Sequence, residues 1–174
     1  MKIGFTATMS CGKTTLVKEL AKLEVFKDYF IATERSQYLK SLGIPLNTDS
    51  TVNGQIIFMA ERSSELLHEN LITDRTIWDV LAFTRLSYSI GTHQKVLLEE
   101  ASELLMDQYD YVFYISPEGI GIEDNGIRET DPIYRQRIDI QIKSLLNDYV
   151  PKNLITISGS TEDRIKQVLH ALHL

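Results

Sequence analysis

The sequence has a single cysteine, four prolines and nine glycines among its 174 residues. One cysteine cannot form an internal disulfide, which favours an intracellular, reducing setting. No apolar run approaches the roughly 20 residues that span a bilayer, and the apolar sequence that begins at residue 2 has no leader-like segment before it. Low-complexity tracts, linkers rich in proline and glycine, and internal repeats are absent too. We therefore expect a cytoplasmic protein with no membrane partner and one domain over residues 1–174.

Basic residues are also scarce relative to acidic ones. The 18 Lys and Arg against 24 Asp and Glu give a formal net charge of −6, and the sequence pI is about 5.2. This balance argues against a broad electrostatic footprint on nucleic acid, although a local basic cleft can exist inside an acidic average. A small-molecule partner is therefore favoured, and a nucleic-acid partner stays open as the less favoured case. The hydrophobic content of 43% is enough for a sizeable core.

Residues 2–15 form the stretch around which the rest is organised, an apolar strand followed by a loop and a helix. The loop matches the P-loop pattern G-x-x-x-x-G-K-[ST] at Gly12, Lys13 and Thr14, whereas Ala7 stands where the first glycine usually stands. Such a loop surrounds the phosphates of a nucleotide with backbone N–H groups at a helix N-terminus. A methyl group at Ala7 fits this role only if that residue keeps a negative φ.

Each loop residue receives an expected role. Lys13 is placed to reach the β- and γ-phosphates, and the Thr14 hydroxyl is placed to complete the shell of a Mg²⁺ ion. Thr15 is a weaker metal ligand because it lies about 100° further round the helix. The rest of the nucleotide cradle is expected to consist of Ser10, Cys11, Gly12 and Thr15.

Dense apolar runs and helical stripes alternate along the chain, which predicts an α/β, doubly wound architecture. Further strands are expected at about 29–32, 70–74, 111–115 and 154–157. Helices are expected at about 13–23, 52–67, 77–88 and 92–105, from Pro132 onward, and after the turn and cap at 159–161. On the helix over 52–67, Gln55, Glu61 and Arg62 are polar enough to touch a substrate, but a solvated face is their more common role.

Two strands end in polar residues that are candidates for chemistry. Ligands of open α/β sheets bind outside the carboxyl ends of the strands, so Glu34 and Arg35 are expected to point toward the P-loop, unless they are a surface pair that caps the next helix. Asp74 resembles a Walker-B acid that holds Mg²⁺, and the Arg75 guanidinium is suited to an acceptor or a phosphate oxygen. We assign Glu34 to the acceptor and Asp74 to Mg²⁺, with the reverse assignment left open.

The residues after Arg75 leave two choices. Asp79 lies one helical turn beyond Arg75 and either orients it or faces the helix dipole. Trp78 either stacks on a base or, more commonly for such a position, belongs to the core.

Residues 118–137 have the composition of a mobile lid that contains arginine. Asn125-Gly126 is a flexible turn signal, and Asp131-Pro132 predicts a helix N-cap followed by proline at the first helical position. Arg135 continues the apolar stripe of the helix that follows and is expected to face the cleft. Arg128 is expected to close over the same phosphates, because a phosphoryl group in transfer needs such cations.

The spacing of the loop, Asp74-Arg75, the Asn-Gly-Ile-Arg stretch at 125–128 and the Gly-Ser-Thr-Glu-Asp-Arg turn at 159–164 resembles the P-loop ATPase/kinase family that includes nicotinamide riboside kinase domains, AAA-type small nucleoside and nucleotide kinases. The resemblance covers nearly the whole chain. It implies a three-layer P-loop fold with a five-stranded parallel sheet and helices on both faces. It further implies ATP·Mg²⁺ as donor, lid arginines on the phosphates, and Gly159 and Ser160 beside the adenine.

The function expected from these features is transfer of the γ-phosphoryl of ATP to a small nucleoside- or nucleotide-like acceptor. One alternative keeps the chemistry and places the acceptor hydroxyl on a nucleotide within DNA or RNA. Another is a nucleotide-binding switch that hydrolyses slowly and signals through lid order. The sequence leaves the identity of the acceptor and the existence of a homodimer open.

Overall fold

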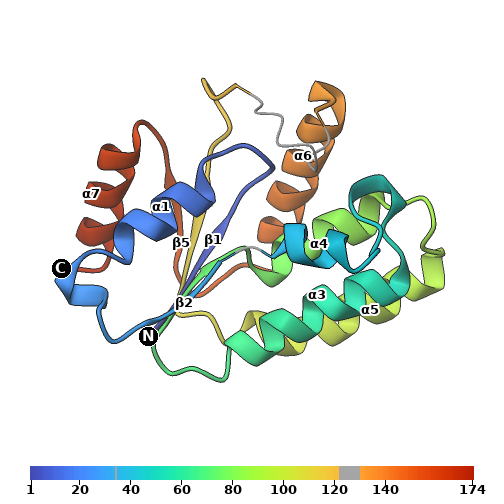
Figure 1. Ribbon diagram of the computed structural model, residues 1–174, viewed down its shortest axis with the longest axis horizontal. Helices are drawn as coiled ribbons and strands as arrows, with labels where there is room; N and C mark the ends of the chain where they lie inside the picture. The colour runs from blue at the N-terminus through green and yellow to red at the C-terminus, as the bar shows by residue number, and fades with distance from the viewer. Residues whose placement is uncertain (34, 122–129) are drawn as a thin grey trace.

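A computed structural model describes residues 1–33, 35–121 and 130–174. Within them, five strands form one parallel sheet (Figure 1). The strands are β1 (Lys2–Thr6), β2 (Phe30–Ala32), β3 (Leu71–Asp74), β4 (Tyr111–Ile115) and β5 (Leu154–Ile157). Their order across the sheet is β2-β3-β1-β4-β5, so β1 is central. The predicted five-stranded parallel sheet is confirmed.

Helices cover both faces of this sheet (Figure 1). One layer contains α1 (Lys13–Leu20) and α7 (Thr161–Ala171); the other contains α3 (Val52–Glu65), α4 (Ile77–Leu86), α5 (Thr92–Met106) and α6 (Pro132–Asp148). Alternate strand residues point to opposite layers. Phe5 and Phe113 stack with ring centroids 5.3 Å apart in the core against α1 and α7, whereas Val112 and Tyr114 join the core under α4 and α6. The three-layer α/β prediction is therefore confirmed.

Shorter elements complete the described chain. They are η1 (Glu24–Phe26), α2 (Ser36–Ser41) and η2 (Asn47–Asp49). The first helix ends at Leu20 rather than at the predicted Leu23, because the next residues form a turn in which Leu23 N–H donates to the Leu20 carbonyl. None of the described helices is long and apolar enough to cross a membrane.

The carboxyl ends of the parallel strands meet at one edge of the sheet, where the P-loop follows β1. In the register of β1 and β3, Phe5 lies opposite Asp74, so the end of β3 is beside the start of the loop. The helix α6 enters from the same edge with Asp131 as its N-cap and Pro132 at its first position, as predicted. Two predicted site residues, Glu34 and Arg128, and residues 122–129 of the predicted lid lie outside the described residues.

Candidate functional site

The loop between β1 and α1 has the backbone conformation of an anion cradle. Ser10 and Gly12 adopt positive φ values of 56° and 74°, which turns successive N–H groups toward one concavity. Ala7 is buried and is not among the described residues with positive φ. The condition for alanine at the first-glycine position is therefore met.

A cavity of about 290 Å³ opens at this loop. It is lined by the predicted nucleotide residues of the P-loop and of the turn at 159–160, together with the predicted acid at the end of β3 and the arginine that follows it. These are Ser10, Cys11, Gly12, Lys13, Thr14, Thr15, Gly159, Ser160, Asp74 and Arg75. The fold therefore brings the turn at 159–160 to the P-loop, from which it is separated by more than 140 positions in sequence.

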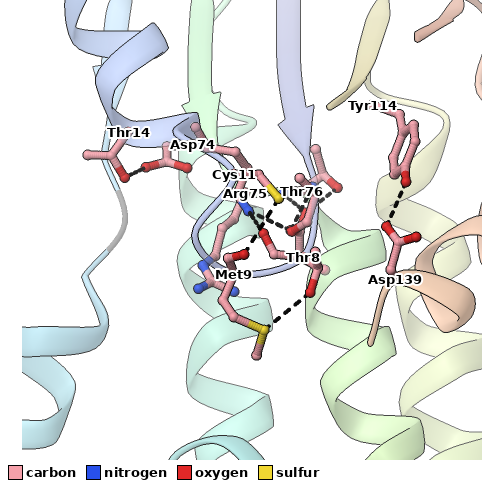
Figure 2. Close-up of polar contacts among 12 residues, drawn as sticks. Thr8, Met9, Cys11, Thr14, Asp74, Arg75, Thr76, Tyr114 and Asp139 are labelled. Atoms are coloured by element: carbon pink, nitrogen blue, oxygen red, sulfur yellow. Dashed lines mark hydrogen bonds and ion pairs between the residues drawn. The ribbon is translucent and has the colours of Figure 1, made fainter. Parts of the chain in front are cut away.

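Thr14 and Asp74 face each other in this cavity (Figure 2). The Thr14 hydroxyl donates to the Asp74 carboxylate, and Asp74 is fully buried. No group of three or more His, Cys, Asp or Glu side chains within the described ranges could hold a metal. Magnesium in nucleotide sites takes one or two protein oxygens and completes its shell with phosphate and water oxygens, so the Thr14 and Asp74 pair fits this metal.

Lys13 is buried beside the loop. Its Nζ donates to the carbonyls of Ala7 at 2.6 Å and Thr8 at 3.1 Å, and it lies 3.7 Å from Oδ1 of Asp79. The ammonium is thus held by the carbonyls of the two residues that follow β1, and Lys13 lines the cavity. A carboxylate as close as Asp79 keeps this cation in place.

Asp79 settles one of the choices that the sequence left open. Its Oδ2 accepts from the Thr76 N–H at 2.8 Å and from the Thr76 hydroxyl at 3.0 Å, which forms a capping box at the start of α4. Its Oδ1 also accepts from the Ala7 N–H at 3.4 Å. The position at the helix N-terminus is confirmed, and Asp79 additionally joins that helix to the P-loop.

Trp78 belongs to the core. It is 1% exposed, and its indole N–H donates to the Tyr149 carbonyl at 3.1 Å.

Arg135 contacts the P-loop from α6. Its Nε donates to the Met9 carbonyl at 3.1 Å, one NH group donates to the Ile120 carbonyl at 2.7 Å, and the other lies 3.6 Å from Sγ of Cys11. Its side chain is therefore directed at the loop. It does not itself line the 290 Å³ cavity.

Arg164 was not anticipated from the sequence. It lies in α7, is 5% exposed, lines the cavity and donates to the Cys11 carbonyl at 2.7 Å. Burial lowers the pKa of its guanidinium, which remains a cation at neutral pH. Helical spacing in the sequence could have indicated that Arg164 faces inward, because it precedes the buried Val168 and Leu172 by one and two helical turns.

Arg75 also lines a second, smaller cavity of about 30 Å³. Its guanidinium lies over the Phe83 ring, 5.2 Å from the centroid. Gln55 and Phe58 of α3 contribute to the walls of this second cavity. Gln55 is 2% exposed, and its Oε1 accepts no hydrogen bond from any residue that the structure describes. The expectation of a solvated face is wrong for Gln55 and Arg62, because α3 turns both side chains inward.

Arg35 lies apart from both cavities. Its guanidinium is 3.5 Å from the Glu61 carboxylate and 4.6 Å from the centroid of the Tyr38 ring. It lines a separate cavity with Phe30 and His68, between β2 and α3. Its expected contact with substrate stays a prediction.

Comparison with known proteins places this geometry in a family. A family model described as an AAA domain matches residues 2–164. A structure of deoxyadenosine kinase from M. mycoides, with dCMP and dCDP bound, is 19% identical with a TM-score of 0.70, over 99% of this chain and 98% of that one. A structure of a NadR protein in complex with NR is 16% identical with a TM-score of 0.73, over 98% of this chain and 50% of that one.

Thymidylate kinase from Ehrlichia chaffeensis is 18% identical with a TM-score of 0.61, over 99% of this chain and 95% of that one. A sequence search of curated proteins finds no match. The structural matches share the fold, and the family match extends over nearly the whole chain. Together they confirm the predicted resemblance, and the chain belongs to the AAA domain family.

Proposed function

We propose that this protein transfers the γ-phosphoryl of ATP to a small nucleoside- or nucleotide-like acceptor with the aid of Mg²⁺. The observation that carries the proposal is the position of Arg75, which lines both the P-loop cavity and the second cavity under α3. A transferase needs a donor site and an acceptor site that meet at the transferred group. Arg75 stands where two such sites would meet.

The donor side consists of the P-loop and the turn before α7. The N–H groups of the loop and the Lys13 ammonium are suited to the phosphates. Gly159 and Ser160, which line the same cavity, are assigned to the base because of the family resemblance. ATP supplies the phosphoryl group, and Mg²⁺, held by Thr14 and Asp74, neutralises phosphate charge. The solved relatives include a deoxyadenosine kinase with bound dATP, which supports a nucleotide at this site.

The acceptor side is the cavity at Gln55. A buried amide oxygen without a donor among the described residues costs free energy unless a ligand group satisfies it. The amino or imino group on a nucleobase edge is such a donor, and Phe58 and Phe83 supply apolar surface beside it. The cavity is smaller than a nucleoside, so its walls must move apart when the acceptor binds. We expect the segment Leu46–Ser50 to move, because it lines the cavity and contains only a three-residue 3₁₀ helix.

The remaining roles belong to residues near the transferred group. Glu34 follows β2 in sequence and is assigned to the acceptor hydroxyl. Arg128 and Arg135 are assigned to the charge that develops on the phosphoryl group. For Arg135 this requires exchange of its present bond with the Ile120 carbonyl, since the guanidinium now contacts loop carbonyls.

The test is transfer of label from γ-labelled ATP to a panel of nucleosides, nucleoside monophosphates and a short oligonucleotide, with water as the only acceptor in the control. We expect a nucleoside or its monophosphate to raise ATP turnover well above that control. Labelling of the oligonucleotide alone would instead favour a nucleic-acid kinase. Turnover that no acceptor raises would favour the switch.

A further inference from the structure

A buried polar network lies directly behind Arg75. It consists of Arg62 and Glu65 of α3 and Thr73 of β3, which are 2%, 9% and 0% exposed. The Arg62 guanidinium donates to one oxygen of the Glu65 carboxylate, and the Thr73 hydroxyl is 2.8 Å from the other. Figure 2 shows Arg75 beside the P-loop, directly after Asp74 at the end of β3.

The network ends on the backbone of Arg75. The Arg75 carbonyl accepts from the Thr73 hydroxyl at 3.0 Å and from an N–H of Arg62 at 3.4 Å. The Thr73 hydroxyl has one proton and two possible acceptors, the Glu65 carboxylate and the Arg75 carbonyl. When that proton is donated to Glu65, the Arg75 carbonyl still accepts a hydrogen bond from the Arg62 N–H. On the other side of the Cα atom, the Arg75 N–H donates to the Phe5 carbonyl at 3.1 Å.

This backbone needs to be held. Arg75 has a φ of 107°, a region that a residue with a side chain rarely adopts. Such conformations persist only where the surroundings impose them, and they are concentrated at functional sites. The conformation directs the Arg75 side chain to the boundary of the two cavities and over the Phe83 ring.

Stability alone does not account for the network. Burial is the largest influence on the pKa of the Glu65 carboxyl and raises it; Arg62 and Thr73 lower it, the nearby Glu61 and Asp74 raise it, and the net shift is upward. A buried ion pair is a weak source of stability, and apolar residues of the same volume often replace one without loss. A role in setting the geometry of a neighbouring group explains why these polar side chains occupy the core.

We propose that Arg62, Glu65 and Thr73 are positioning residues that fix the backbone of Arg75 and thereby set its guanidinium between donor and acceptor. The functional half of this inference rests on the proposed phosphoryl transfer. The structural half does not, because it concerns the Arg75 carbonyl.

The Arg75 carbonyl can be observed by itself. Arg75-Thr76 is the only Arg-Thr pair in the sequence. Labelling arginine carbonyls with ¹³C and threonine amides with ¹⁵N therefore gives one carbonyl-to-amide NMR correlation, which reports this peptide group. Thr73→Val removes the hydroxyl and keeps the shape of the side chain, whereas Thr73→Ser keeps the hydroxyl. Thr6→Val is the matched control, because Thr6 is an equally buried threonine of β1 whose hydroxyl has no partner in the described chain.

We expect Thr73→Val to move or broaden the Arg75 signal and to lower kcat for the best nucleoside of the panel by about 10- to 100-fold, the scale of a small misplacement of a reacting group. The KM for ATP should change by less than about twofold, since the loop itself is intact. Thr73→Ser should restore both signal and kcat, and Thr6→Val should leave both unchanged. If Thr73→Val does not fold, Arg62→Lys serves instead, because it keeps a cation beside Glu65 but cannot also reach the carbonyl.

The outcomes separate the two halves. An Arg75 signal that stays in place in the folded variants overturns the inference, whatever the activity. A displaced signal with unchanged kcat shows that the network does not position Arg75 for transfer and also overturns it. A displaced Arg75 signal in Thr73→Val, together with a wild-type protein that phosphorylates no member of the panel, supports the hold on the backbone and contradicts the proposed function.

Discussion

Replacement of Asp79 by asparagine tests how the P-loop is held to α4. The carboxylate accepts three hydrogen bonds in a fully buried site, two from Thr76 and one from Ala7, and it lies 3.7 Å from the Lys13 ammonium. An asparagine has one acceptor oxygen, so its NH₂ group must face a donor on one of the two sides. We therefore expect loss of at least one charge-assisted hydrogen bond and of the favourable contact with the helix dipole.

These losses set the magnitude. A hydrogen bond to a charged group contributes about 1.5–3 kcal/mol, and an acid at a helix N-terminus about 0.3–1 kcal/mol. Asp79→Asn should thus lower the free energy of unfolding by about 3 kcal/mol, measured by urea denaturation at pH 7 with the slope unchanged. It should also weaken ATP binding, because Lys13 loses the counter-ion that holds it beside the loop.

The control is Asp163→Asn in α7. Asp163 forms the same kind of capping box with Ser160, but at the surface, so its replacement should cost much less. Equal losses for the two variants, or an Asp79→Asn protein within about 0.5 kcal/mol of wild type, the range of an ordinary surface substitution, would refute the reasoning.

Three further changes have defined outcomes. Gly4→Ala should lower the free energy of unfolding by about 1–3 kcal/mol through overpacking, because a Cβ there would lie 2.5 Å from the Thr76 methyl group and 3.0 Å from the Tyr109 ring. A free energy of unfolding equal to that of wild type would show that these neighbours move aside without cost. Burial raises the pKa of Glu99, but the hydrogen bonds and charge of Arg85 and the hydrogen bond from Tyr149 together lower it by more, so that the net shift is downward. The stabilisation from Glu99 is therefore complete above its unfolded pKa of about 4.3 and is lost as the pH falls through the folded pKa. Urea denaturation at pH 7 and pH 3 should show a smaller acid loss for Glu99→Gln than for wild type, and an identical loss would contradict the assignment. Gln55→Leu should raise the KM for the acceptor by about 10-fold or more, as expected when a buried hydrogen bond to substrate is removed, with the KM for ATP unchanged; equal rises in both constants would place Gln55 outside the acceptor site.

Features that depend on local sequence were predictable. The apolar strands, the cap at Asp131-Pro132 and the Gly12-Lys13-Thr14 signature each rest on neighbouring residues, and all appear where expected. Parallel strands then determine that the end of β3 meets the loop, which explains why Thr14 and Asp74 could be paired in advance.

Contacts between distant segments were not predictable in this way. Asp79 meets Ala7 across 72 positions, and Arg164 meets Cys11 across 153. Each of these polar residues sits on a buried helix face, where periodicity marks the position as inward but does not name the partner. The positive φ of Arg75 has no sequence signal either, because tertiary hydrogen bonds impose it on a residue that does not favour it.

The most direct measurement compares Lys13→Ala with Lys18→Ala in the transfer assay. Lys13 is buried in the cradle, whereas Lys18 lies exposed on the same helix. If the cavity at the P-loop is the donor site for ATP, a folded Lys13→Ala protein should lose transfer to the nucleoside acceptor by about 10²-fold or more, as for other cations that stabilise a transition state, while Lys18→Ala keeps wild-type turnover. Turnover of Lys13→Ala within a factor of two of wild type would contradict a phosphoryl donor at this loop.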